Sequence, residues 1–184
     1  MSPASPPPGR ILVVDDEEVI RRLIAQHLTG LGHACEQAGD GRLGLAMAST
    51  GSFDVVLSDI TMPGFDGLTL ARELRKTAPS TPVVMVTGNA TFDHALRAIR
   101  HGATDFLLKP FNLDALDQTV RRAMERRRAL REQEDAVRVL EKRLEEQAVA
   151  HAVAEQEIAR LRAEVERLGK DLDLIRDAAR PATV

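Results

Sequence analysis

The sequence predicts an α/β protein: a five-stranded parallel sheet with helices on both faces, whose last helix extends into a long coiled coil. Short apolar runs alternate with amphipathic helical patterns five times between residues 11 and 125. This order is typical of a parallel sheet whose crossover helices cover both faces. The coiled coil is predicted because residues 112–179 contain no proline and a single glycine, Gly169.

Four of the five predicted strands are short apolar runs with polar residues directly after or close to their ends. Continuous apolar runs of this length are typical of strands buried on both faces. The second run has the weakest strand pattern of the five. The predicted strands are 11–14, 33–38, 53–57, 82–86 and 105–108.

Apolar residues at helical spacing follow each strand, and these faces are expected to pack on the sheet. Gly30 and Gly32 mark the end of the first helix, Asp40 is expected to cap the second, and Gly102 is expected to end a helix over about 91–101. Asn112 and Asp114 are candidate caps of the last helix. The apolar faces are Val19, Ile20, Leu23, Ile24 and Leu28; Leu43, Leu45, Ala46 and Met47; Leu68, Leu70, Ala71 and Leu74; and Ala95, Leu96, Ala98 and Ile99.

Composition excludes several functions. The net charge is -3, with 10 basic and 12 acidic residues in 1–111 and 15 and 16 in 112–184. Neither part is a basic module, so we expect no direct binding of nucleic acid or of an anionic membrane. The single cysteine, Cys35, lies in a predicted strand, where an inert thiol is expected, and it fits a reducing cytoplasm.

Four segments are expected along the chain: a disordered Pro-rich leader at 1–9, a folded domain at 10–127, a coiled-coil helix at 128–179 and a frayed tail at 180–184. The leader lacks the basic and apolar regions of a signal peptide. No apolar run approaches the ~20 residues that span a bilayer. We therefore expect a cytoplasmic protein with no membrane association.

Polar residues that suit phosphoryl chemistry end four of the five strands: Asp15, Asp16, Asp59, Thr87 and Lys109. In doubly wound folds ligands bind beyond the carboxyl ends of the strands. Crowded carboxylates repel one another, and Mg²⁺ relieves this with oxygen ligands. The lysine and the hydroxyl suit phosphate, and a carboxylate can accept a phosphoryl group covalently. Taken singly, the acidic pair could instead cap a helix, and the lysine could be a solvated surface residue.

These residues lie in motifs that resemble those of the CheY-like receiver domain of two-component response regulators. The resemblance covers residues 10 to about 125 and implies a flavodoxin-like fold. It implies a signalling domain rather than an enzyme, one that catalyses only its own phosphorylation and dephosphorylation. The motifs are Ile-Leu-Val-Val-Asp-Asp-Glu at 11–17, Asp-Ile-Thr-Met-Pro-Gly-Phe-Asp-Gly at 59–67, Val-Thr-Gly at 86–88 and Asp-Phe-Leu-Leu-Lys-Pro-Phe at 105–111.

The resemblance also implies a role for each matched position. Asp59 accepts a phosphoryl group from a partner histidine kinase or a small phosphodonor. Mg²⁺ is the implied cofactor, held by Asp15, Asp16, Asp59 and the backbone carbonyl of Thr61. Thr87 and Lys109 bind the phosphoryl oxygens.

The implied conformational switch consists of Thr87 and Phe106, and the implied Lys109–Pro110 peptide bond is cis. Phe106 lacks the hydroxyl of a tyrosine switch, so any contact through that group is absent. A buried core aromatic is the alternative for Phe106.

The long last helix fits one heptad frame, and ten of its twelve a and d residues are apolar. A lone helix of roughly 100 Å cannot bury such a stripe, so a partner is implied. Gln147 and His151 are the polar exceptions. The a positions are Val137, Leu144, His151, Ile158, Val165 and Leu172, and the d positions are Leu140, Gln147, Ala154, Leu161, Leu168 and Ile175.

Charge pairs at flanking positions favour a parallel homodimer. Glu157 would face Arg162 of the second copy, and Asp171 would face Arg176. A solvated single helix and an antiparallel or mixed coil are the alternatives.

We therefore expect a response regulator whose phosphorylation acts on coil assembly or on an unknown downstream protein. One alternative is a receiver and linker from a longer regulator with a DNA-binding or cyclic-dinucleotide effector. Another is a scaffold or localisation protein built on the coil.

Overall fold

The computed structural model describes residues 8–88, 100 and 102–178, and the side chains of these residues up to 173. The expected helix at about 91–101 lies outside the described residues, except for Arg100. The chain divides into two units, which we call the N-terminal unit (1–133) and the C-terminal unit (134–184). Helix α5, Leu113–Ala178, runs through both.

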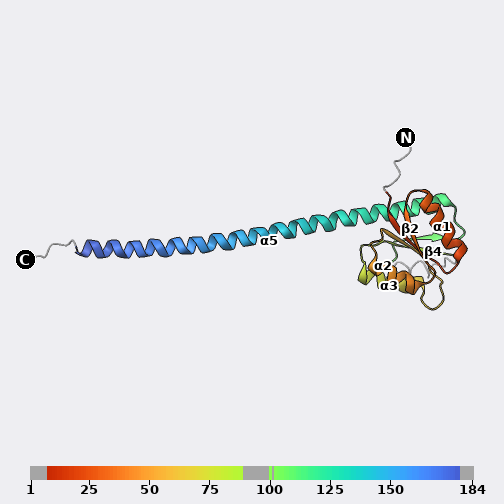
Figure 1. Ribbon diagram of the computed structural model, residues 1–184, viewed down its shortest axis with the longest axis horizontal. Helices are drawn as coiled ribbons and strands as arrows, with labels where there is room; N and C mark the ends of the chain where they lie inside the picture. Colours follow the sequence, from red (N-terminus) through yellow and green to blue (C-terminus); the bar gives the residue numbers. More distant parts are fainter. Residues whose placement is uncertain (1–7, 89–99, 101, 179–184) are drawn as a thin grey trace, which may run out of the picture. The chain divides into compact units, whose positions relative to one another are not determined.

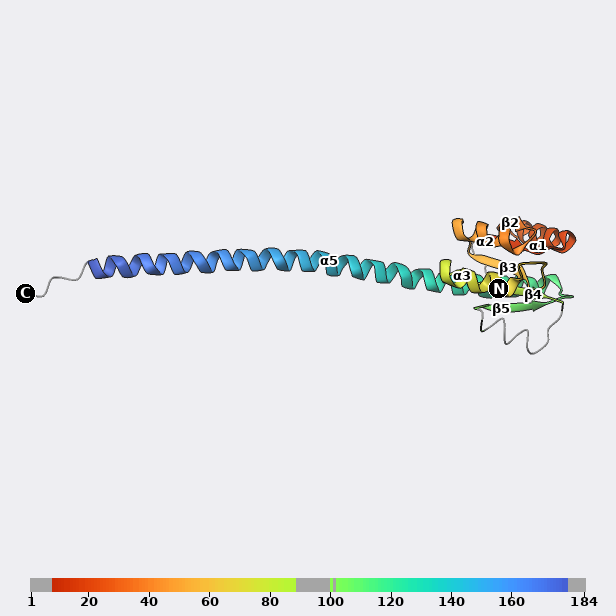
Figure 2. The same ribbon diagram turned by 90° about the horizontal axis from the view of Figure 1, so that it is seen from below.

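The N-terminal unit is a five-stranded parallel sheet in the order β2-β1-β3-β4-β5. In Figure 2 the labelled strands β2, β3, β4 and β5 follow one another in this order. The predicted fold class is confirmed. The strands are β1 (Arg10–Val14), β2 (Ala34–Ala38), β3 (Val55–Asp59), β4 (Val83–Thr87) and β5 (Asp105–Leu108).

Helices cover both faces of the sheet. Helices α2 and α3 lie on one face, and α1 and the first part of α5 lie on the other (Figure 1). Each face has its own apolar core, because the strand side chains point alternately to the two faces. The helices are α1 (Glu18–Gly30), α2 (Gly41–Thr50) and α3 (Gly67–Thr77).

The predicted N-caps Asp40 and Asn112 are confirmed, whereas the other candidate, Asp114, lies within the first turn of α5. The Asp40 side chain accepts a hydrogen bond from Leu43 N at 2.8 Å, and Asn112 accepts one from Ala115 N at 2.7 Å. Both contacts satisfy backbone donors of a first helical turn. Gly32, just after α1, and Gly102 have φ of 97° and 95°, a left-handed conformation that favours glycine. The helix that Gly102 is expected to end lies outside the described residues.

The predicted apolar faces of α1 and α2 are partly wrong. In α1 the buried residues are Ile24, Ala25 and Leu28, whereas Val19 is 79% exposed and Leu23 48%. The predicted arc was wider than the strip of helix that contacts the sheet.

Helix α2 packs through small residues, and its predicted core residue Leu43 is exposed. A Cβ on Gly44 would lie 2.9 Å from the Val14 side chain. The absence of a side chain at Gly44 therefore allows α2 to approach β1 closely.

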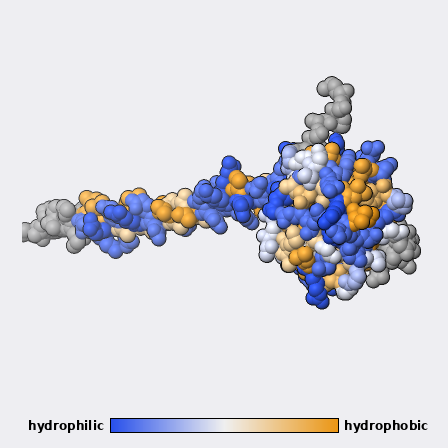
Figure 3. Space-filling view, turned by 45° about the vertical axis from the view of Figure 1, so that its right-hand side comes forward, coloured by the Kyte–Doolittle hydropathy of each residue, from blue (hydrophilic) through white to orange (hydrophobic). Residues whose placement is uncertain are grey.

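In the C-terminal unit every described side chain from 134 to 173 is exposed. Apolar side chains recur along this part of the helix (Figure 3). The exposed large apolar residues at predicted a and d positions are Val137, Leu140, Leu144, Ile158, Leu161, Val165, Leu168 and Leu172. No helix in the described part of the chain is both long and apolar enough to cross a membrane.

Candidate phosphoacceptor site

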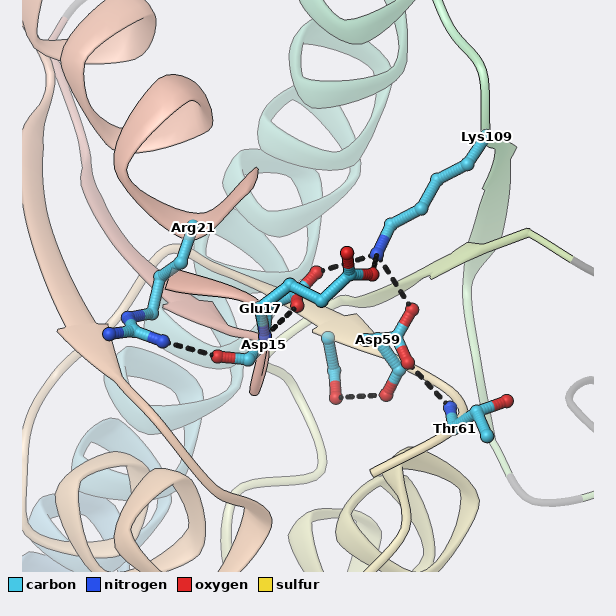
Figure 4. Close-up of polar contacts among 7 residues, drawn as sticks. Asp15, Glu17, Arg21, Asp59, Thr61 and Lys109 are labelled. Carbon is cyan, nitrogen blue, oxygen red and sulfur yellow. Dashed lines mark hydrogen bonds and ion pairs between the residues drawn. The ribbon is translucent and has the colours of Figure 1, made fainter. Parts of the chain in front are cut away.

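Three of the predicted site residues converge at the carboxyl edge of the sheet. Lys109 Nζ lies 2.8 Å from Asp15 Oδ2 and 3.1 Å from Asp59 Oδ1 (Figure 4). Asp15 follows β1, Asp59 ends β3 and Lys109 follows β5. Parallel strands bring these distant positions to one edge, so one ammonium group joins two buried carboxylates.

The Asp59 carboxylate is held in place by its own loop. Its second oxygen, Oδ2, accepts a hydrogen bond from Thr61 N at 2.6 Å. Gly67, the first residue of α3, packs directly on the Asp59 backbone, and a Cβ there would collide with the Asp59 carbonyl. A glycine at 67 therefore lets α3 begin beside the acceptor.

Burial and charge shift the two facing groups. Burial raises the pKa of Asp59, and the hydrogen bond and charge of Lys109 oppose this rise. Burial acts to lower the pKa of Lys109, but its hydrogen bonds to Asp15 and Asp59 outweigh burial and raise it. Lys109 is therefore a cation at neutral pH, and its positive charge offsets the negative charges of Asp15 and Asp59.

Asp15 is almost fully buried, with 2% of its side chain exposed. Its Oδ1 accepts a hydrogen bond from Glu17 N at 2.8 Å, and its backbone carbonyl accepts one from Arg21 at 2.6 Å. The alternative was that these acidic residues cap α1, and the structure does not support it. Glu17 occupies the N-cap position and makes no side-chain cap hydrogen bond.

Two contacts of the site were not predicted. Glu17 Oε1 lies 3.3 Å from Lys109 Nζ, and the Arg21 side chain holds the loop that carries Asp15. Glu17 is the N-cap of α1 and Arg21 lies four residues further on, so both lie on one side of the helix start, and this spacing was a usable signal.

The remaining predicted site residues lie in β4 and β5 or in the loops that follow β1 and β3. Thr87 is buried at the end of β4, and its carbonyl accepts a hydrogen bond from Lys109 N at 2.7 Å. Asp16 and Thr61 are exposed at the same edge. Phe106 is 43% exposed on β5, so it is not the buried core aromatic that was the alternative. The Lys109–Pro110 bond is cis, as the resemblance implied.

The donor set of this edge suits a hard divalent cation. Asp15 and Asp59 already direct carboxylate oxygens at one positive group, and oxygen ligands are those that Mg²⁺ prefers. The Asp16 side chain is exposed and is not part of this pair. Within the described ranges no group of three His, Cys, Asp or Glu side chains is placed to hold a metal ion.

The fold and the site together define a class: a doubly wound α/β domain with two buried aspartates and a partly buried lysine at its carboxyl edge. Residues 11–121 match the response regulator receiver domain model. The chain therefore belongs to the response regulator receiver family, whose domains generally bind Mg²⁺ for phosphorylation and interact with histidine kinases.

Relatives include both kinases and regulators. The chain is 43% identical over 121 residues to the sensor histidine kinase RcsC of Salmonella typhi, covering 66% of this chain and 13% of that protein. It is 40% identical over 118 residues to the transcriptional regulatory protein TcrA of Mycobacterium tuberculosis, covering 64% of this chain and 46% of that protein. The chain thus spans less than half the length of these relatives.

Solved structures match the same region. The receiver domain of NtrX from Brucella abortus is 43% identical, with a TM-score of 0.60, over 62% of this chain and 98% of that one. The chemotaxis protein CheY4 of Vibrio cholerae is 34% identical, with a TM-score of 0.61, over 63% and 98%.

Proposed function

We propose that this protein is a response regulator that takes a phosphoryl group onto Asp59 from a histidine kinase. The observation that carries the proposal is the placement of Lys109 Nζ between Asp15 and Asp59, at 2.8 and 3.1 Å. A lysine in this position can follow the charge of Asp59 when the carboxylate becomes an acyl phosphate.

The transfer is a displacement at phosphorus. An Asp59 carboxylate oxygen forms the new P–O bond, the P–N bond to the kinase imidazole breaks, and the imidazole leaves with its electron pair and takes a proton. Thr61 N, which already donates to Asp59 Oδ2, orients the acceptor. Lys109 and the Thr87 hydroxyl then bind the phosphoryl oxygens.

We assign the Mg²⁺ ligands to Asp15, Asp16, Asp59 and the backbone carbonyl of Thr61. The bound cation would neutralise charge on the transferring phosphoryl group. The buried pair Asp15 and Asp59 supports this assignment, since both carboxylates are oriented toward the Lys109 ammonium group and could turn the same oxygens toward a metal ion. The exposed Asp16 would contribute from the rim.

The switch assigned to Thr87 and Phe106 rests on their neighbouring strands. Met85 pairs with Phe106 in the β4–β5 register, and Thr87 pairs with Leu108. A hydroxyl that moves toward phosphate leaves space behind it, and the half-exposed Phe106 ring is the group that would turn into that space.

The output is assigned to the coiled coil, as a parallel homodimer, and to an unidentified protein partner. We retain 10–127 as the receiver and 128–179 as the coil. Exposed apolar side chains at a and d positions support pairing, because such a stripe is stable in water only against a partner.

The second candidate function is that of a receiver and linker from a longer regulator. It is favoured because the match covers only 13% and 46% of the two relatives.

Phosphorylation of intact protein tests the site. Acetyl phosphate and Mg²⁺ should add one phosphoryl group, detected by intact mass, to the wild type and to Asp114→Asn. Asp114 is an exposed aspartate of the first turn of α5 and serves as the matched control. Asp59→Asn should add none, and phosphorylation that survives in this variant would refute the assignment.

Light scattering with Mg²⁺, with and without beryllofluoride, tests the output. A change in mass would show that phosphorylation acts on coil assembly. A dimer of unchanged mass would locate the output on the receiver surface, and a monomer in both states would contradict the proposed coil.

A further inference from the structure

A cavity of about 540 Å³ lies at the edge of the sheet opposite to the phosphoacceptor site. Its lining includes Val83, which begins β4, and Thr104, which directly precedes β5. Asp59 and Lys109 lie at the other ends of parallel strands. The other walls come from α3, from the loop that joins α3 to β4, and from α5.

Two arginines line this cavity: Arg75 of α3 and Arg126 of α5. Twelve residues line it in all, and none of them is an aspartate or a glutamate. In the part of the chain that the structure describes, neither guanidinium is paired with a carboxylate. By contrast, Arg122 and Arg131 of the same stretch of α5 pair with Asp105 and Asp54.

Arg75 is positioned by backbone rather than by an acidic partner. Its Nη1 lies 3.4 Å from the Arg100 carbonyl oxygen, to which it donates. Its aliphatic stem passes over Gly102, where a Cβ would lie 2.9 Å from Arg75 Cδ. The glycine therefore leaves room for the arginine at the rim of the cavity.

The rest of the lining is hydroxyl-bearing or apolar. The hydroxyl-bearing residues of the lining are Ser80, Thr81 and Thr104. The apolar lining consists of Ala71, Pro79, Pro82, Val83, Ala103 and Leu130. Ligand pockets commonly have volumes of about 300–1,000 Å³ and combine apolar walls with a few polar groups. This cavity has that size and that mixture.

We propose that this cavity binds a small organic phosphate. Guanidinium groups match phosphate with paired hydrogen bonds, so Arg75 and Arg126 hold the phosphoryl group. The apolar lining contacts the organic part. The site is separate from Asp59 and takes its ligand without covalent chemistry.

Calorimetry on the full chain tests the proposal, with EDTA present so that Mg²⁺-dependent chemistry at Asp59 does not contribute. The probes are phenyl phosphate, inorganic phosphate and benzoate. Phenyl phosphate should bind most tightly, since it alone offers both a dianion and an apolar group. The proposal is wrong if phenyl phosphate shows no saturable binding, or if benzoate binds as tightly as phenyl phosphate.

Variants locate the binding. Arg75→Gln and Arg126→Gln should each weaken phenyl phosphate about tenfold, the effect of one lost charge-assisted contact. Arg72→Gln is the matched control, because Arg72 lies on α3 outside the lining and pairs with Glu73. Asp59→Asn should bind as the wild type does. Binding that both cavity variants leave unchanged would overturn the site, whatever the result of the phosphorylation assay.

Discussion

Helix α5 differs along its length in what surrounds its apolar residues. Within the N-terminal unit Leu116, Val120 and Ala123 are buried against the sheet. Beyond Gln133, large apolar residues such as Leu161 and Val165 are 52% and 69% exposed. The same secondary structure thus has two sources of stability. The first segment is stabilised by tertiary packing. The second has no such packing within the described chain, and we propose that a partner supplies it, because propensity alone stabilises a water-exposed helix only marginally.

The spacing of apolar residues fits this difference. Leu116, Val120 and Ala123 recur at intervals of four and three, which makes a helix face that lies on the sheet. The later residues follow a seven-residue repeat that is interrupted at Gln147 and His151, and such a repeat is the pattern of a seam between helices. The following substitutions test the contrast, from the largest expected effect to the smallest.

Leu116→Ala should have the largest effect on folding. Leu116 is fully buried, and removing a buried leucine side chain costs about 2–5 kcal/mol of unfolding free energy. Urea denaturation followed by circular dichroism measures the loss. Leu140→Ala, in the same helix but 58% exposed, is the control and should leave the N-terminal unit as stable as before. Equal losses in both variants would contradict the contrast.

Leu161→Asp should act on association and not on the receiver fold. In a paired coil this substitution would bury one carboxylate from each helix, and the two would face each other. Because buried like charges are unfavourable, we expect dimerisation to weaken about a hundredfold or more. Sedimentation equilibrium measures the change. Ala163→Asp adds the same charge at an outer heptad position and should have little effect. If both variants associate alike, Leu161 is not at the interface.

Asp54→Asn should have a smaller effect, at the point where α5 leaves the sheet. Asp54 Oδ1 pairs with Arg131 at 2.9 Å, and Oδ2 accepts a hydrogen bond from Arg10 N at 2.9 Å. An asparagine keeps one acceptor and loses the charge, so we expect a loss of about 1 kcal/mol in thermal or urea unfolding. Glu132→Gln, which removes an exposed pair with Arg128, should cost less.

The pH dependence of unfolding should show the smallest effect, through His33. Burial lowers the pKa of His33 below its ordinary value, and Nδ1 of the neutral ring accepts a hydrogen bond from Gly9 N at 3.2 Å. The unfolded chain therefore takes up this proton first. Stability is full above about pH 6.5 and falls as the pH drops through that value toward the folded pKa.

Melting temperatures between pH 7.5 and 5.5 measure this effect. His33→Gln should flatten the profile. The exposed His151 of the C-terminal unit provides the control, and His151→Gln should leave melting of the N-terminal unit unchanged. A wild-type profile that His33→Gln does not alter would rule out this group as the cause.

Much of the fold and of the candidate site could be read from the sequence. Every strand except β2 is centred on a local apolar run, and the polar residues Asp15, Asp59 and Lys109 lie within two residues of the ends of such runs. Because parallel strands end at one edge, naming the strands was enough to predict that these groups meet. The caps at Asp40 and Asn112 were equally local, since a cap contacts residues only three positions away.

Other features depended on how the elements pack. Helical periodicity placed Val19 and Leu23 in the core of α1, but only the contact with the sheet decides which part of an apolar arc is buried. The pairing of Glu17 with Lys109 and the cavity shared by Arg75 and Arg126 join residues from separate elements. Periodicity describes one helix at a time, whereas burial and contact depend on the distance and rotation between elements, which only the tertiary structure decides.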